Sequence, residues 1–236
     1  MQPTQVLNRF AACGIPCDEA LAARITRYHE LLLDWNTRMD LTNVTDEDEM
    51  LDRHYVDSLM VLTMPQLLPT DGKVIDVGTG AGFPGIPLRI VRSDIRLTLL
   101  DSLQKRLDFL EKVSAMLGQN NSLVHARAEI GGIDPDLREH FDVAVSRAVA
   151  RLSVLCEYCL PYVRVGGFLL ALKGPDPEEE LRDAAHAIAL LGGGQAQVTN
   201  YSLPCGDGRT LILIPKERPT PKTYPRQRVK ISDRPL

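Results

Sequence analysis

The 236-residue sequence has no apolar run as long as a membrane span, and its first residues carry neither the basic nor the apolar region of a signal peptide. Cysteine is scarce, and the five present are an odd number, which is typical of reduced thiols. Cys156 and Cys159 form a lone C-x-x-C without the second pair that a zinc site needs. These absences predict a soluble, cytoplasmic protein with no metal centre.

A glycine-rich segment, residues 74–85, is the most informative part of the chain. It is an apolar, β-branched run that carries Asp76 and then breaks into four glycines, and Asp101 closes the next apolar run. No Gly-Lys-Ser/Thr follows, which excludes a P-loop. We expect a strand, a tight turn without Cβ atoms and a helix start here, with Asp101 ending a second strand where it can bind ribose hydroxyls. The pattern predicts an adenosine-containing cofactor.

Two cofactors fit this loop. Gly80 to Gly85 satisfies the G-x-G-x-x-G of dinucleotide-binding proteins, and Asp101 lies at the distance expected of a ribose-binding acid. Read from Asp76, the same residues give D-x-G-x-G-x-G, which is similar to the first motif of S-adenosylmethionine methyltransferases. An acid just before the loop suits the ammonium of that cofactor better than a polyanion. A nicotinamide-binding protein and a non-catalytic nucleotide-sensing module remain alternatives.

The hydrophobic pattern divides the chain into three segments. In residues 1–65, apolar side chains between Leu21 and Trp35 recur every three or four positions, which predicts a helical extension. In residues 66–216, strands alternate with helices, which predicts an α/β, Rossmann-like parallel sheet. The expected strands are 73–77, 96–100, 122–126, 142–146 and 167–172, followed by an antiparallel pair, 196–203 and 210–215. This closing hairpin favours the class I methyltransferase sheet over the two-half nicotinamide layout.

The third segment, residues 217–236, is a basic, proline-rich tail. Residues 216–236 hold seven basic and two acidic side chains, whereas the first 70 residues hold five basic and eleven acidic. Four prolines predict an extended tail without a helix. Beside a cofactor site, such a tail is a candidate arm for phosphates, and Arg226, Arg228 and Lys230 are its RNA-binding candidates. We expect the tail to be an arm and not a packing element, so that its removal would barely change cofactor affinity.

Residues 76–88, DVGTGAGFPGIPL, resemble the signature of the RsmG family, also called glucose-inhibited division protein B. Matching pieces cover nearly the whole chain and include Trp35-Asn36, Asp40-Leu41-Thr42-Asn43, His54 with Asp57-Ser58, Leu100-Asp101-Ser102, Lys105-Arg106, Phe141-Asp142, Ser146-Arg147-Ala148 and Tyr224-Pro225-Arg226. That family methylates N7 of a guanine in the 530 loop of bacterial 16S rRNA, position 527 in the usual rRNA numbering. The resemblance implies an S-adenosylmethionine-dependent rRNA (guanine-N7)-methyltransferase, with 16S rRNA or the small ribosomal subunit as partner and a monomeric state. Many relatives carry a glycine-containing basic segment where this chain has residues 227–230, QRVK.

The resemblance and the loop pattern together assign candidate site residues. The cofactor-binding candidates are Gly78, Gly80, Phe83, Asp101, Ala128, Glu129 and Arg147. The pair Ala128-Glu129, after the third strand, is expected to flank the adenine. Arg147 and His54 are candidates for positioning, because Arg147 cannot accept a proton and guanine N7 already offers a lone pair.

One absent motif bears on the chemistry. Exocyclic-amine methyltransferases carry an Asn/Asp-Pro-Pro-aromatic run after the fourth strand, where this chain reads Val145-Ser146-Arg147-Ala148. Attack by N7 on the sulfonium methyl is a one-step displacement, so alignment can supply most of the rate enhancement. A methyltransferase for another RNA or for a small molecule is the alternative within this class.

Overall fold

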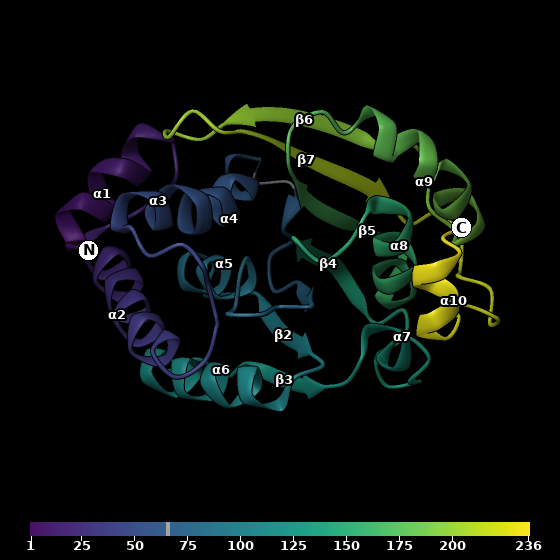
Figure 1. Ribbon diagram of the computed structural model, residues 1–236, viewed down its shortest axis with the longest axis horizontal. Helices are drawn as coiled ribbons and strands as arrows, with labels where there is room; N and C mark the ends of the chain where they lie inside the picture. The colour runs from purple at the N-terminus through teal and green to yellow at the C-terminus, as the bar shows by residue number, and fades with distance from the viewer. Residues whose placement is uncertain (65–66) are drawn as a thin grey trace.

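The computed structural model describes residues 1–64 and 67–236, except for the side chains of 228 and 229. In this part of the chain, seven strands form one mixed sheet (Figure 1). The strands are β1 (Lys73–Val77), β2 (Arg96–Asp101), β3 (Ser122–His125), β4 (Phe141–Arg147), β5 (Val163–Lys173), β6 (Gln197–Ser202) and β7 (Gly208–Pro215). Their order is β3-β2-β1-β4-β5-β7-β6, in which β1 to β5 are parallel and β6 and β7 antiparallel. The predicted fold class is confirmed, including the closing hairpin.

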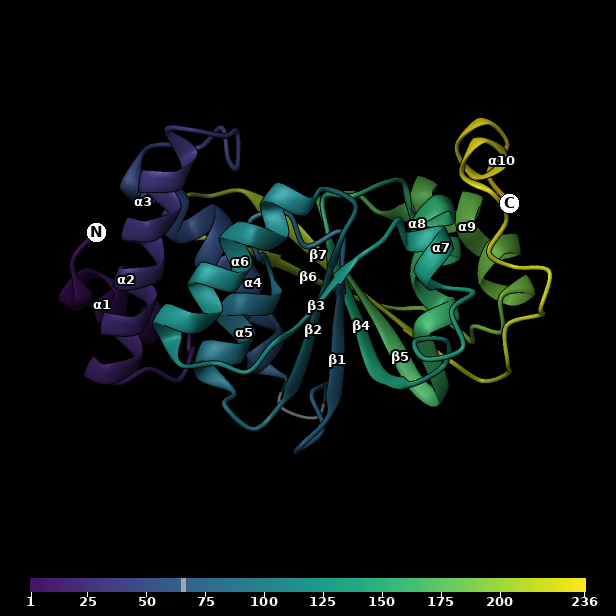
Figure 2. The same cartoon turned by 90° about the horizontal axis from the view of Figure 1, so that it is seen from below.

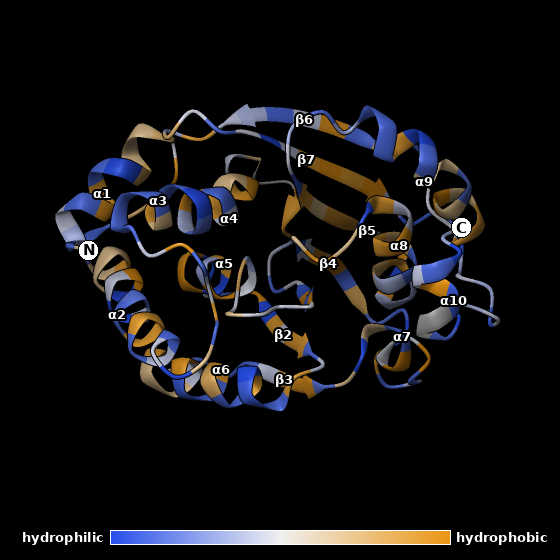
Figure 3. Cartoon of the chain, in the orientation of Figure 1, coloured by the Kyte–Doolittle hydropathy of each residue, from blue (hydrophilic) through white to orange (hydrophobic). Residues whose placement is uncertain are grey.

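Helices cover both faces of this sheet, as Figure 2 shows. One face carries α5 (Gly85–Val91) and α6 (Gln104–Leu117), and the other carries α7 (Ala128–Gly131), α8 (Leu152–Cys159) and α9 (Glu178–Leu190). Because both faces are covered, the central strands are apolar along their length, which Figure 3 shows as orange arrows between helices with blue outer faces. Among the described residues, no helix combines the length and the hydropathy that crossing a membrane requires.

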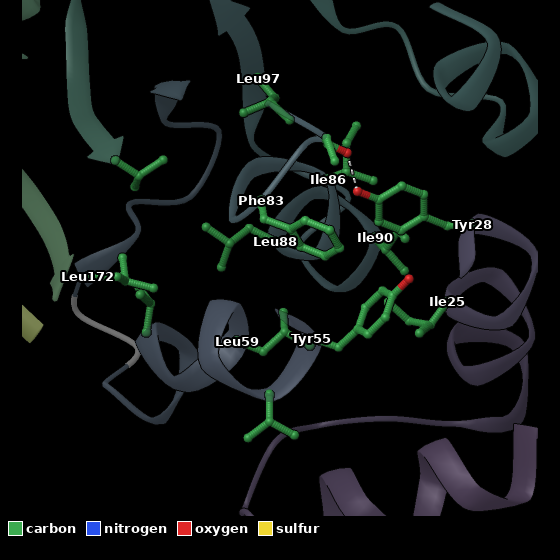
Figure 4. Close-up of a cluster of buried hydrophobic side chains, with 14 of the residues drawn as sticks. Ile25, Tyr28, Tyr55, Leu59, Phe83, Ile86, Leu88, Ile90, Leu97 and Leu172 are labelled. Carbon is green, nitrogen blue, oxygen red and sulfur yellow. Dashed lines mark hydrogen bonds between the residues drawn. The ribbon is translucent and has the colours of Figure 1, made fainter. Parts of the chain in front are cut away.

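The N-terminal extension packs over α5 and α6 and shares their core. It consists of α1 (Pro3–Ala12), α2 (Glu19–Asn36), α3 (Glu47–Met50), a π-helical turn (Leu51–Val56), α4 (Asp57–Leu59) and a 3-10 turn (Met60–Thr63). Tyr28 and Tyr55 point toward Phe83 in Figure 4, and the Tyr28 hydroxyl donates to the carbonyl of Ala81, 2.5 Å away. The extension therefore buries the outer side of the glycine loop. The sequence also predicts a linker at residues 65–72, between the extension and the first strand, and its first two residues lie outside the described part.

The tail differs from its prediction. Residues Arg228–Asp233 form a short helix, α10, which lies beside α8. Pro219, Pro221, Pro225 and Pro235 all lie outside α10, so none of them removes a hydrogen bond within it. The expectation of a helix-free tail was therefore wrong for these six residues.

Candidate functional site

The glycine loop follows β1 and is stabilised by hydrogen bonds to the carboxylate of Asp76. This residue is fully buried, and its Oδ2 accepts hydrogen bonds from the Thr79 hydroxyl (2.7 Å) and the Gly85 amide (2.9 Å). Burial raises the pKa of Asp76 to about 6. The sequence suggested that this acid would meet a cofactor ammonium, which stays a prediction: Oδ2 holds the turn, and the buried Oδ1 has no hydrogen-bond partner among the described residues.

Gly78, like Gly82, is a loop glycine at which the backbone geometry and the surrounding space both demand glycine. Its φ is +73°, and a Cβ there would lie 2.7 Å from Cγ2 of Val149. Asp101, at the end of β2, accepts from the amides of Gly80 (3.0 Å) and Leu103 (2.9 Å). The second strand end and the loop are thus joined by one carboxylate that is only 2% exposed.

A cavity of about 360 Å³ opens at the carboxyl ends of β1, β2, β3 and β4. It is lined by Val77, Gly78, Leu100, Asp101, Ser102, Arg106, Ala126, Arg127, Ala128, Glu129, Ala148, Val149 and Tyr158. Ligands of open α/β sheets bind at such an edge, and the volume lies in the range of small-molecule sites. Bare backbone at Gly78 and an acid at Asp101 fit an adenosine-containing cofactor. We call this cavity the cofactor pocket.

Four of the predicted cofactor residues line this pocket, and three do not. Gly78, Asp101, Ala128 and Glu129 are in its wall, whereas Gly80, Phe83 and Arg147 are absent from it. The carbonyl of Ala128 accepts a hydrogen bond from the Tyr162 hydroxyl (2.6 Å), which fixes the start of α7. The expected pair after the third strand therefore lies in the wall of this cavity, and its contact with adenine stays a prediction.

Phe83 instead joins the loop to the N-terminal extension. It is 6% exposed, and its ring centroid lies 5.5 Å from that of Tyr28 and 4.9 Å from that of His54. The guanidinium carbon of Arg147 lies 5.1 Å from the centre of the same ring. Phe83 thus packs the glycine loop against the N-terminal extension.

Arg147 ends β4 and points toward the extension. It donates to the carbonyl of Arg53 (2.5 Å) and to Oδ2 of Asp57 (3.2 Å), which is 3% exposed. Oδ1 of Asp57 accepts from the hydroxyl of Tyr201 in β6 (2.8 Å). The anionic partner that an arginine at this strand end requires is therefore a residue of the protein, and the sequence pattern did not indicate it.

His54 belongs to the π-helical turn and is held on both ring nitrogens. Its Nε2 lies 2.8 Å from the Thr42 hydroxyl, and its Nδ1 lies 3.3 Å from Nη2 of Arg147. Burial and the neighbouring Arg147 lower the pKa of His54 to about 4. The ring is neutral at physiological pH, which suits positioning.

A second cavity of about 400 Å³ lies next to the cofactor pocket, and Ala148 lines both. Its charged lining consists of Arg53, Asp57, Arg147, Lys173, Glu180 and Arg209, and the neutral His54 also lines it. Four of these side chains are permanent or near-permanent cations and two are carboxylates. We call this cavity the basic pocket. Sequence analysis missed Lys173 and Arg209; the one available signal was the Lys-Gly-Pro that follows the fifth strand.

The tail candidates differ in their surroundings. Arg226 donates from its backbone amide (2.7 Å) and from Nε and Nη2 to the carboxylate of Glu157, which is 1% exposed. Lys230 is exposed on α10, and the side chain of Arg228 lies outside the described part of the structure. The tail was expected not to pack, and this is wrong at Arg226, because a buried carboxylate needs a paired cation.

The parallel sheet, the closing hairpin and the cofactor pocket define a class I S-adenosylmethionine-dependent methyltransferase. Solved structures share the fold: a SAM-dependent O-methyltransferase from Thermotoga maritima has a TM-score of 0.53 at 13% identity and covers 80% of this chain and 73% of its own. A predicted O-methyltransferase from Agrobacterium tumefaciens has a TM-score of 0.53 at 17% identity, covering 72% and 83%.

Sequence comparison defines the family within that class. The family model described as rRNA small subunit methyltransferase G (GidB) matches residues 21–208. Relatives bearing the name ribosomal RNA small subunit methyltransferase G are 43% identical in Lactobacillus johnsonii, over the whole of both chains, and 47% identical in Alkaliphilus oremlandii, over 94% of each. The chain belongs to this family, as the sequence motifs indicated. The expected cofactor, S-adenosylmethionine, is thereby confirmed, and the nicotinamide alternative is not supported.

Proposed function

We propose that this protein methylates N7 of a guanine in the 530 loop of 16S rRNA, position 527, in the cytoplasm. The names of its family and of its relatives support small-subunit rRNA as the substrate class. The observation that carries the proposal is the shared wall at Ala148, which sets a cation-lined cavity directly beside the cofactor pocket.

The residues that would hold the cofactor line the first pocket. Gly78 leaves room for its close approach, and Asp101, at the end of β2, would accept hydrogen bonds from the ribose hydroxyls. Ala128 and Glu129 would lie along the adenine. When bound, S-adenosylmethionine supplies an electrophilic methyl group on a positively charged sulfur.

The basic pocket would take the target nucleotide. Lys173, Arg209 and Arg53 bring positive charge to a site that RNA phosphates must approach. Lys173 is only 13% exposed and bonds to the Ala150 carbonyl (2.8 Å) and to Glu180 (2.7 Å), so its ammonium is held in place. Asp57 and Glu180 supply negative charge near a purine that becomes positively charged on methylation.

No proton has to be removed from N7 before attack. His54 is neutral and already bonded to Thr42 and Arg147, so we assign it and Arg147 to holding the pocket wall next to Phe83. The role left to the protein is alignment and exclusion of water, for which effective molarities correspond to up to about 11 kcal/mol of the barrier.

The experiment that tests the proposal is methyl transfer from labelled S-adenosylmethionine to naked 16S rRNA and to small subunits from a strain lacking the enzyme. We expect one methyl group per RNA and, after reduction, aniline cleavage at guanine 527, because N7-methylguanine is positively charged. Label at another nucleotide, or a product that resists aniline, would refute the N7 assignment. The same assay decides which of the two substrates is accepted.

A further inference from the structure

The tail crosses the outside of the short helix α7 before it reaches α10. We define the strap as residues 217–226. One guanidinium joins it to α7: Arg138 donates from Nη1 to the carbonyls of Gly132 (2.9 Å) and Tyr224 (2.8 Å), and from Nη2 to the carbonyl of Thr220 (2.7 Å). Gly132 directly follows α7, so Arg138 ties the end of that helix to two points of the strap.

The start of the strap is fixed in the core. The Lys216 ammonium is fully buried and donates to the Leu160 carbonyl (2.5 Å) and the Thr220 hydroxyl (2.6 Å). The Thr220 amide donates to Oε1 of Glu139 (2.7 Å), which lies 3.4 Å from the ammonium. Burial lowers the pKa of Lys216 to about 8, against the opposing effect of Glu139.

The far end of the strap is fixed on α8. Arg226 makes its hydrogen bonds to the buried Glu157. Tyr158, which follows Glu157 in α8, lines the cofactor pocket. Ile231 of α10 is fully buried and adds an apolar contact beyond the strap. Both ends are thus anchored, one on Leu160 and one on the helix behind the pocket.

Between these anchors, α7 is clamped from two sides. A Cβ at Gly131 would lie 2.5 Å from the Tyr162 hydroxyl, and a Cβ at Gly132 would lie 3.1 Å from Cγ of Pro225. A helix of four residues cannot be stable alone, because fixing the first turn loses more conformational entropy than its hydrogen bonds offset. The position of α7 therefore depends on Tyr162 beneath it and on the strap outside it.

We propose that the strap positions α7 for S-adenosylmethionine binding, and that Arg138 and Arg226 are positioning residues for the cofactor although neither lines its pocket. The proposal rests on the proposed function, because it takes the cofactor pocket as the S-adenosylmethionine site. Residues Ala128 and Glu129 of α7 form the wall that would move when the strap is released. The strap thus acts on the cofactor, whereas the sequence suggested that cofactor affinity would be independent of the tail.

The test uses Arg138→Met in the full-length chain. All described partners of Arg138 are neutral carbonyls, so the substitution leaves no buried charge unpaired. We expect the dissociation constants of S-adenosylhomocysteine and of adenosine, measured by calorimetry, to rise by the same factor of about five or more. The KM for S-adenosylmethionine should rise equally while kcat at saturating cofactor stays unchanged. Arg226→Gln should act in the same direction.

Arg218→Met is the matched control, because Arg218 belongs to the strap but donates to the Ala189 carbonyl of α9. It should bind both ligands as the wild type does. The proposal is overturned if Arg138→Met keeps wild-type affinity, if Arg218→Met weakens binding as much, or if adenosine binding is unaffected while S-adenosylhomocysteine binding falls. A wild-type protein that binds no S-adenosylhomocysteine would instead refute the proposed function, which separates the two failures.

Discussion

The cofactor pocket and the basic pocket share Ala148 but are assembled in different ways. The first is built mainly from residues that lie at or just after the ends of β1 to β4, with Arg106 added from α6 and Tyr158 from α8. The second combines the extension (Arg53, His54), the end of β5 and strand β7. A local sequence pattern can specify the first, whereas the second exists only once distant segments have packed together.

The two pockets also differ in charge. Arg106 and Arg127 balance Asp101 and Glu129 in the cofactor pocket, while four cations face two carboxylates in the basic pocket. A balanced site suits a cofactor that carries both signs of charge, and a cationic site suits phosphates. The comparison predicts that substitutions will separate cofactor binding from RNA binding.

Gly78→Val should have the largest effect. A side chain at φ +73° that also meets Val149 should raise the dissociation constant of S-adenosylhomocysteine about 100-fold or more. RNA affinity without cofactor should not change, as filter binding would show. Gly14→Val is the control, since Gly14 has φ +69° and open space around its Cβ position. Equal loss of cofactor binding in both variants would break the comparison.

His54→Gln tests the electrostatics of the basic pocket through stability. The folded pKa of His54 is about 4 and its ordinary value is 6.5, so the unfolded chain binds the proton first as the pH falls. The contribution of the neutral His54 side chain to the free energy of unfolding is therefore complete above pH 6.5 and is lost as the pH falls toward 4. Between pH 7.5 and 5, urea unfolding should show the stability difference between wild type and variant narrowing by about 2 kcal/mol. A constant difference would mean that the ring titrates normally.

Lys173→Met should separate the pockets in the direction opposite to Gly78→Val. Loss of one held cation should raise the KM for RNA about tenfold, or about 1.4 kcal/mol, with cofactor affinity unchanged. Steady-state methyl transfer at saturating cofactor measures this effect. Lys112→Met, on the exposed face of α6, is the matched control. If Lys173→Met weakens cofactor binding instead, the two pockets do not act separately.

Lys230→Ala should have the smallest effect and concerns the tail as an RNA arm. If its exposed ammonium contacts one phosphate, the slope of log K against log salt should fall by about 0.7, as for single-stranded RNA. Arg38→Ala, at an exposed residue just after the end of α2, should leave the slope unchanged. An unaltered slope for Lys230→Ala would remove this residue from the RNA interface.

The sequence predicted the sheet, its hairpin and four residues of the cofactor pocket, because strand ends and glycine turns are local features. It could not predict that Asp76 accepts hydrogen bonds from the loop that follows it, since these bonds depend on the orientation of the Thr79 hydroxyl and the Gly85 amide in the folded chain. Nor could it pair Arg147 with Asp57, which lies 90 residues earlier. Arg226 was misjudged for the same reason, because the buried Glu157 is 69 residues away.

The buried Asp57 has a consequence for the order in which the chain folds during synthesis. Its hydrogen-bond partner Tyr201 follows 144 residues later. At about 5–20 residues per second, the ribosome needs roughly 7 to 30 s to reach Tyr201 after it has made Asp57. Until then this carboxylate cannot complete its network and stays in water. The α4 segment, which Asp57 begins, is thus among the first segments translated and among the last to dock.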